Sequence, residues 1–130
     1  MKNILFLNIE EVIKIHAHQI ALFGGLPGIR DYNLLESALY TPQSTFDGNY
    51  LHQDIFAMAA AYGFHLIKNH PFVDGNKRTG IICPVLFLEY NDYEIEISQK
   101  KLFDIAISLA TSKLSINQFA LFLKKNCPTH

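Results

Sequence analysis

The sequence has few of the features that mark secreted, membrane-spanning or nucleic-acid-binding proteins. Its two cysteines, Cys83 and Cys127, lack the spacing of a metal-binding CxxC pair and are too few for a disulfide framework. No run approaches the ~20 apolar residues of a membrane helix, and the apolar run near the N-terminus is too short for a signal peptide. The 11 lysines and arginines form no block, and the net charge is −1, which argues against direct binding of nucleic acid. We therefore expect a soluble, cytoplasmic protein with no membrane attachment.

The spacing of apolar and capping residues predicts an all-α chain. A length of 130 residues suits a single domain, residues 1–130, and an apolar content of 49% is enough to build a core. The turn-rich stretch 42–50 predicts a small hairpin or flap. About six helices are expected, near residues 9–23, 34–41, 52–68, 76–90, 98–111 and 115–125. Capping boxes mark two of the helix starts: Asn8 with Glu11 and Ser115 with Gln118.

The stretch HPFVDGNKRTG, residues 70–80, joins the third and fourth of these helices and has the composition of an anion site. A helix that begins at Gly75 or Asn76 offers free backbone N–H groups and a partial positive charge. Glycine lets the backbone approach a ligand closely. Lys77 and Arg78 add positive charge that suits phosphate oxygens.

Two further residues of this stretch suggest chemistry rather than binding alone. Asp74 would repel a phosphate, but it is a sensible neighbour if Mg²⁺ bridges the two. His70 can accept a proton from an attacking hydroxyl near neutral pH. A base, a metal ligand and a phosphate cradle are the parts that phosphoryl or nucleotidyl transfer requires.

The residues alone favour a plainer interpretation. Asp-Gly-Asn is common in turns, Asp74 could merely cap the next helix, and Lys77 and Arg78 could be solvated surface. The stretch is not a P-loop, because it lacks the first glycine of GxxxxGK[ST] and a preceding strand. No pair of the other histidines has a zinc-like spacing with a third ligand.

The stretch resembles the active-site motif of the Fic/Doc family, HxFx(D/E)GN(G/K)R. The residues that fall on this motif are His70, Phe72, Asp74, Gly75, Asn76 and Arg78. The segments FGGLPGIRD, LLESALYTPQSTF and LFLEYNDYEI lie in the same order as in the death-on-curing (Doc) toxins of that family. The resemblance therefore covers nearly the whole chain.

This resemblance implies a compact, all-helical Fic-type fold with a small flap. The flap, within Thr41–Tyr50, would align a target peptide by strand addition. His70 would be the general base or would position the acceptor hydroxyl, and Asp74 would bind Mg²⁺. The phosphates of ATP would be held by Gly75, Asn76, Lys77 and Arg78.

Two departures from the AMP-transferring members of the family indicate which reaction to expect. Those members usually have glycine at the position of Lys77 and a further arginine at the position of Ile81. Doc proteins share both departures, and the resemblance implies that they pass the γ-phosphate of ATP to a threonine of elongation factor Tu and arrest translation. AMP transfer and a catalytically inert helical binding module remain the alternatives.

The chain contains no (S/T)xxxE(G/N) inhibitory motif of the kind that restrains some Fic proteins. We therefore expect control by a separate antitoxin whose disordered tail folds into a groove. The apolar residues of the first helix region are candidates for that groove.

Pro84 lies inside the helix that follows the motif. It cannot donate a hydrogen bond to the carbonyl of Gly80, so the sequence predicts a kink or an early break there.

Overall fold

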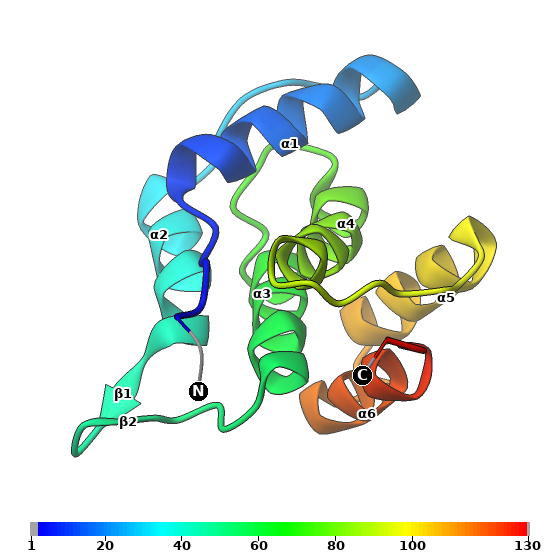
Figure 1. Cartoon of the computed structure of the whole chain (residues 1–130). Coiled ribbons are helices and arrows are strands. Elements are labelled where there is room, and N and C mark those ends of the chain that lie inside the picture. Colours follow the sequence, from blue (N-terminus) through cyan, green and yellow to red (C-terminus); the bar gives the residue numbers. More distant parts are fainter. Residues whose placement is uncertain (1–2, 130) are drawn as a thin grey trace.

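The computed structural model describes residues 3–129, and helices form most of this part of the chain (Figure 1). A hairpin of β1 (Thr45–Phe46) and β2 (Asn49–Tyr50), with a preceding 3-10 turn η1 (Thr41–Gln43), connects the second helix to the third. Among the described residues, no helix is long and apolar enough to cross a membrane. The predicted all-α fold with a small flap is confirmed. The α-helices are α1 (Ile9–Phe23), α2 (Tyr32–Tyr40), α3 (Ile55–Asn69), α4 (Asn76–Tyr90), α5 (Gln99–Ala110) and α6 (Ile116–Lys125).

The helix starts follow from side-chain caps, with one exception. Both predicted capping boxes are present at α1 and α6. The other caps accept an N–H group of the first helical turn: Asp31 for α2, Asp54 for α3 and Ser98 for α5. Because Asp54 caps it, α3 begins later than the sequence pattern indicated. Only α4 starts without a side-chain cap among these helices, which leaves its first turn free for other partners.

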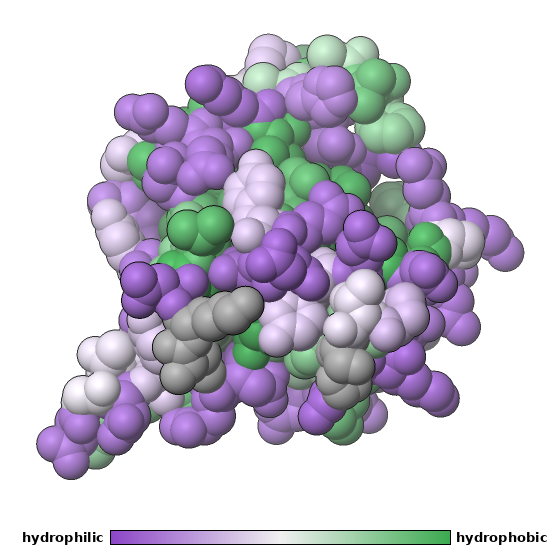
Figure 2. Space-filling model, in the orientation of Figure 1, coloured by the Kyte–Doolittle hydropathy of each residue, from purple (hydrophilic) through white to green (hydrophobic). Residues whose placement is uncertain are grey.

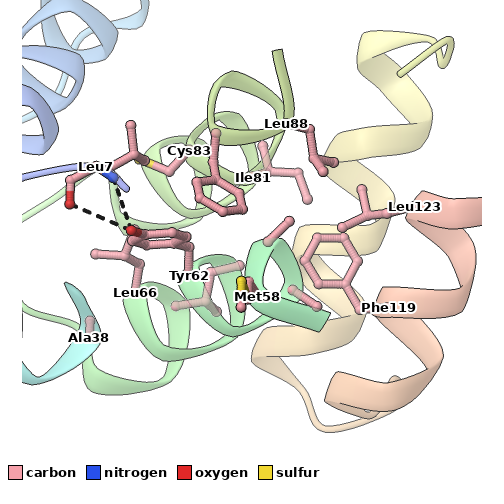
Figure 3. Packing of buried hydrophobic residues seen from close by; sticks show 14 of the residues in the cluster. Leu7, Ala38, Met58, Tyr62, Leu66, Ile81, Cys83, Leu88, Phe119 and Leu123 are labelled. Atoms are coloured by element: carbon pink, nitrogen blue, oxygen red, sulfur yellow. Dashed lines mark hydrogen bonds between the residues drawn. The ribbon is translucent and has the colours of Figure 1, made fainter. Parts of the chain in front are cut away.

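The central helix is α3, which packs against α2, α4 and α6 (Figure 1). Figure 3 shows the side chains of Met58 and Tyr62 meeting those of Cys83 on α4 and Phe119 on α6. The hydroxyl of Tyr62 accepts the N–H of Leu7 at 3.0 Å, which ties the N-terminal segment to α3. Burial raises the pKa of Tyr62 well above its ordinary value, so the hydroxyl stays neutral.

Two glycines allow the close approach of α3 and α4. A Cβ atom on Gly63 would lie 2.6 Å from the carbonyl oxygen of Gly80 and 2.8 Å from Cε2 of Phe119. One on Gly80 would lie 2.5 Å from Cγ1 of Ile67. The contact that positions α4, and therefore the start of α4, has no room for an added methyl group.

Replacement of Gly63 by alanine should therefore destabilise the protein, although alanine is the better helix former. We expect the free energy of unfolding to fall by about 1–3 kcal/mol, as for other overpacked cores. Urea unfolding followed by circular dichroism measures the change. A midpoint equal to or above that of the parent protein would show that the two helices do not approach so closely.

Pro84 does not end α4, which continues to Tyr90. Of the kink or early break predicted from the sequence, the early break is therefore wrong, and the kink stays a prediction. The proline is buried, and so are residues on both sides of it, including Cys83 and Phe87. Packing against the core on either side of the proline holds the helix across the missing hydrogen bond to Gly80.

Candidate active site

The predicted site lies in the loop between α3 and α4, which runs beside α1 (Figure 1). His70 ends α3 in the left-handed conformation, with φ 52° and ψ 54°. Its side chain is exposed. A substrate hydroxyl can therefore reach the imidazole from solvent.

Phe72 anchors the loop to the core. Its ring is fully buried and stacks on the imidazole of His16, with the ring centres 3.7 Å apart and the planes at 4°. The side-chain amide of Asn76 accepts the N–H of Phe72 and donates to its carbonyl, both at 3.0 Å. Asn76 is only 5% exposed, so its amide holds the loop in shape and its backbone N–H is what remains for a ligand.

His16 is a site residue that the sequence did not single out. Its Nε2 lies 2.8 Å from the carbonyl oxygen of Asp74, and since a carbonyl only accepts, Nε2 donates. His16 shares the buried face of α1 with Val12 and Gln19, and this helical spacing was the available signal. The sequence could not reveal the loop that meets this face.

The carboxylate of Asp74 is exposed and held in place by backbone groups. It accepts the N–H of Leu26 at 3.2 Å and that of Gly75 at 3.0 Å. These two hydrogen bonds lower the pKa of Asp74; desolvation opposes them, and the nearby His70 and His16 contribute a further lowering that is smaller than either hydrogen bond. Asp74 therefore stays ionised at neutral pH. It does not cap α4, because it bonds no N–H group of the first helical turn.

The first turn of α4 has the form of an anion site. Gly75 precedes it with φ 78°, and a Cβ atom there would lie 3.0 Å from Cδ1 of Ile20. The N–H groups of residues 76–78 find no acceptor among the residues that the structure describes. Lys77 projects into solvent beside them. The partial positive charge of the helix start and the positive charge of Lys77 therefore both lie close to Asp74.

The donor set near Asp74 fits Mg²⁺ that arrives with a nucleotide. Within residues 3–129, no three histidine, cysteine, aspartate or glutamate side chains form a group that could hold a metal ion. Mg²⁺ commonly takes one or two carboxylates from the protein and its other ligands from phosphates and water. A single exposed, ionised carboxylate beside an anion site matches that requirement, so Asp74 would hold the ion.

Arg78 faces a hydrophobic groove rather than open solvent. Its guanidinium carbon lies 4.0 Å from the ring centre of Phe23 and 5.1 Å from that of Phe103. These residues and Leu22 line a groove of about 140 Å³ that α1, α4 and the start of α5 enclose. Figure 2 shows hydrophobic side chains gathered over the C-terminal end of α1, where Leu22 and Phe23 are exposed.

Ile81, one turn after Lys77 on α4, is only 5% exposed and belongs to the core. An arginine at this position would have to displace core packing or turn into the groove beside Arg78. The two departures in the motif therefore lie in different environments, one solvated and one buried.

The hairpin is present where the sequence predicted a flap, but it stands away from His70. It leads into the first residue of α3, whereas His70 follows the last, and α3 has 15 residues, a length of about 22 Å. Figure 1 shows the hairpin and the loop of His70 at opposite ends of α3. In this arrangement the hairpin does not border the histidine.

Comparison with known proteins matches residues 6–88 to the Fic/DOC family. A protein of Escherichia phage P1, "Protein kinase doc", is 30% identical over 116 residues, which cover 89% of this chain and 90% of that protein. "Toxin Doc" of Mycolicibacterium smegmatis is 39% identical over 90 residues, 69% of this chain and 67% of that protein. Both similarities include the loop and the helices that carry it.

Proposed function

Since the chain belongs to the Fic/DOC family, we propose that it is a Doc-like toxin that transfers the γ-phosphate of ATP to a threonine of elongation factor Tu and so arrests translation. The observation that carries the proposal is the meeting of three groups on one surface. An exposed His70, an ionised Asp74 and the free N–H groups of α4 lie within one short loop and the turn that follows it. The kinase name of the phage relative supports the choice of phosphate.

The residues of this loop divide the reaction between them. The imidazole of His70 accepts the proton of the threonine hydroxyl as its oxygen forms a bond to the γ-phosphorus. The bond from that phosphorus to the bridging oxygen breaks, and ADP leaves with the electron pair. Lys77 and the first N–H groups of α4 stabilise the charge on the phosphate oxygens. Mg²⁺, held by Asp74, would neutralise part of the phosphate charge when bound.

Mass spectrometry of elongation factor Tu after incubation with this protein, ATP and Mg²⁺ tests the proposal. The addition of one phosphate supports it. The addition of AMP would assign the chain to the AMP-transferring branch of the family. If the target stays unmodified under conditions in which the nucleotide binds, the result would favour the alternative of a catalytically inert binding module.

Lys77 is the residue that we expect to set the choice of phosphate over AMP. Its replacement by glycine removes a cation from the transferring phosphate and opens space above the N–H groups of α4. We expect phosphate transfer to fall about 10–100-fold, the equivalent of one charge-assisted hydrogen bond. Quantitative mass spectrometry of the target measures both phosphate and AMP.

A matched variant separates the charge of Lys77 from its bulk. Lys77→Met keeps most of the length of the side chain and removes the charge, so it should lose phosphate transfer as Lys77→Gly does. Only the glycine variant should gain some AMP transfer, and that gain stays small because Ile81 still occupies the place of the second arginine. Unchanged phosphate transfer in both variants would show that the lysine does not determine the reaction.

We further infer that a separate antitoxin restrains the protein, and that its disordered tail folds into the groove beside Arg78. The groove presents the exposed apolar residues of α1 that the sequence indicated, including Leu22 and Phe23. A segment that fills it would also cover the guanidinium of Arg78 next to the anion site. Because the target acts in translation, we place the activity in the cytoplasm.

A further inference from the structure

Among the residues that the structure describes, no backbone N–H group after α3 turns back to its last carbonyls. His70 takes the left-handed conformation of a helix cap, in which following N–H groups normally turn back to the last carbonyls. The next residue is Pro71, which has no N–H group. The last carbonyls of α3 therefore need donors from elsewhere in the chain.

Arg30, 40 residues earlier in the sequence, supplies those donors. Its Nε donates to the carbonyl of His70 at 2.7 Å, and its Nη2 donates to the carbonyl of Asn69 at 2.9 Å. The planar guanidinium can address two neighbouring carbonyls at once, and its positive charge suits the negative end of the helix.

Backbone hydrogen bonds hold the main chain of Arg30 in place beside the loop of His70. The N–H groups of Arg30 and Asp31 both donate to the carbonyl of Pro71, at 2.7 and 3.0 Å. Ile29 pairs with Phe72 in an isolated antiparallel bridge. The carboxylate of Asp31 is engaged with the N–H of Leu34 at the start of α2, so it does not draw the guanidinium away.

The conformation of His70 needs this support. A left-handed backbone is uncommon for any residue other than glycine, and a residue before proline favours an extended one. Since φ and ψ set the direction of the Cα–Cβ bond, a return to the extended region would point the imidazole in another direction. The backbone carbonyl of His70 is the atom that Arg30 holds.

We propose that Arg30 is the positioning residue of His70: its guanidinium replaces the missing backbone cap of α3 and keeps the imidazole aimed at the substrate hydroxyl. The expected effect of Arg30 on the transfer rate rests on the proposed function, in which His70 is the base. Its expected effect on the backbone conformation of His70 is independent of that function, so the two effects can be tested separately.

Two variants of Arg30 test this role in the full chain. Arg30→Met keeps the length of the side chain and removes every donor, whereas Arg30→Lys keeps the charge and loses the two-pronged geometry. Lys14→Met, which removes an exposed cation from the middle of α1, is the matched control. Circular dichroism confirms that each variant is folded.

The first measurement is the pair of ¹³Cα and ¹³Cβ chemical shifts of His70, which report its backbone conformation without any need for activity. We expect them to move toward extended values in Arg30→Met, to move less in Arg30→Lys, and to stay as in the parent protein in Lys14→Met. Unchanged shifts in Arg30→Met would overturn the inference.

The second measurement is the steady-state kinetics of phosphate transfer to elongation factor Tu. A displaced base should lower kcat, by up to about 100-fold in Arg30→Met, and leave the KM for ATP unchanged, because the anion site of α4 is intact. If Arg30→Met lowers kcat but leaves the chemical shifts of His70 unchanged, the inference is also overturned, because Arg30 would then act on another part of the site. If His70→Ala keeps its activity, the proposed function fails, and the chemical shifts still decide the role of Arg30.

Discussion

Replacement of His70 by alanine is expected to lower the rate of phosphate transfer by about 10²–10⁴-fold, the range that a positioned general base contributes. The imidazole is exposed, so its loss leaves no cavity, and thermal stability should change little. In cells, expression of the variant should no longer arrest growth. Transfer to elongation factor Tu, followed by mass spectrometry, measures the rate.

Two further variants test whether the loss of activity is specific to the imidazole of His70. His70→Asn keeps a residue that tolerates the left-handed conformation and removes the imidazole, so it should be as inactive as the alanine variant. His18→Ala removes an exposed histidine of α1 and should be as active as the parent protein. Full toxicity of His70→Ala would show that this histidine is not the base.

Replacement of Asp74 by alanine should abolish the Mg²⁺-dependent part of nucleotide binding. The carboxylate is the one acidic group in the loop between α3 and α4, and its lowered pKa keeps it charged. Calorimetric titration of ATP with and without Mg²⁺ measures the effect. We expect the parent protein to bind ATP more tightly with Mg²⁺, and the variant to show no such difference.

Asp74→Asn separates the charge of this residue from its hydrogen bonds. The amide oxygen can still accept the N–H of Leu26 and hold the neighbouring segment, but it is a poor partner for Mg²⁺. Loss of Mg²⁺-dependent binding in both variants supports the metal role. If affinity for nucleotide is kept and only the melting temperature falls, Asp74 serves the fold alone.

The lowered pKa of Asp74 also predicts how Mg²⁺-dependent nucleotide binding changes with pH. Because the folded-state pKa lies below the ordinary value for aspartate, the group stays ionised to a lower pH than a free carboxyl. Mg²⁺-dependent binding should therefore persist as pH falls through the ordinary range of aspartate, and should be lost only as pH falls through the lowered pKa.

The helices could be predicted from the sequence because local chemistry determines where they begin and end. The capping boxes at Asn8 and Ser115 involve residues three positions apart, and both are present. The same holds for the start of α4 at Asn76, where a glycine in the left-handed conformation precedes a free helical turn. His70 and Asp74 were selected by resemblance to the family motif, and they lie in one loop because they are only four positions apart.

Two contacts that shape the loop could not be predicted, because each joins residues far apart in the chain. His16 reaches the carbonyl of Asp74 across 58 positions, and Arg30 reaches His70 across 40. The motif did not indicate that the side-chain amide of Asn76 bonds to the backbone of Phe72, and the role of Asn76 in holding phosphate stays a prediction. The predicted early end of α4 at Pro84 was wrong because the packing that carries the helix past the proline comes from the tertiary structure.

The bonds that Arg30 and His16 make also bear on when the chain acquires its activity during synthesis. The N-terminal residues leave the ribosome first, yet they have no loop to hold until α3 and the start of α4 have followed them. Contacts of such long sequence separation form late, because the intervening chain must first be ordered. A nascent or partly folded chain thus carries the histidine and the aspartate without their geometry. On the proposed function, the chain would act on the translation machinery only after these long-range contacts have formed.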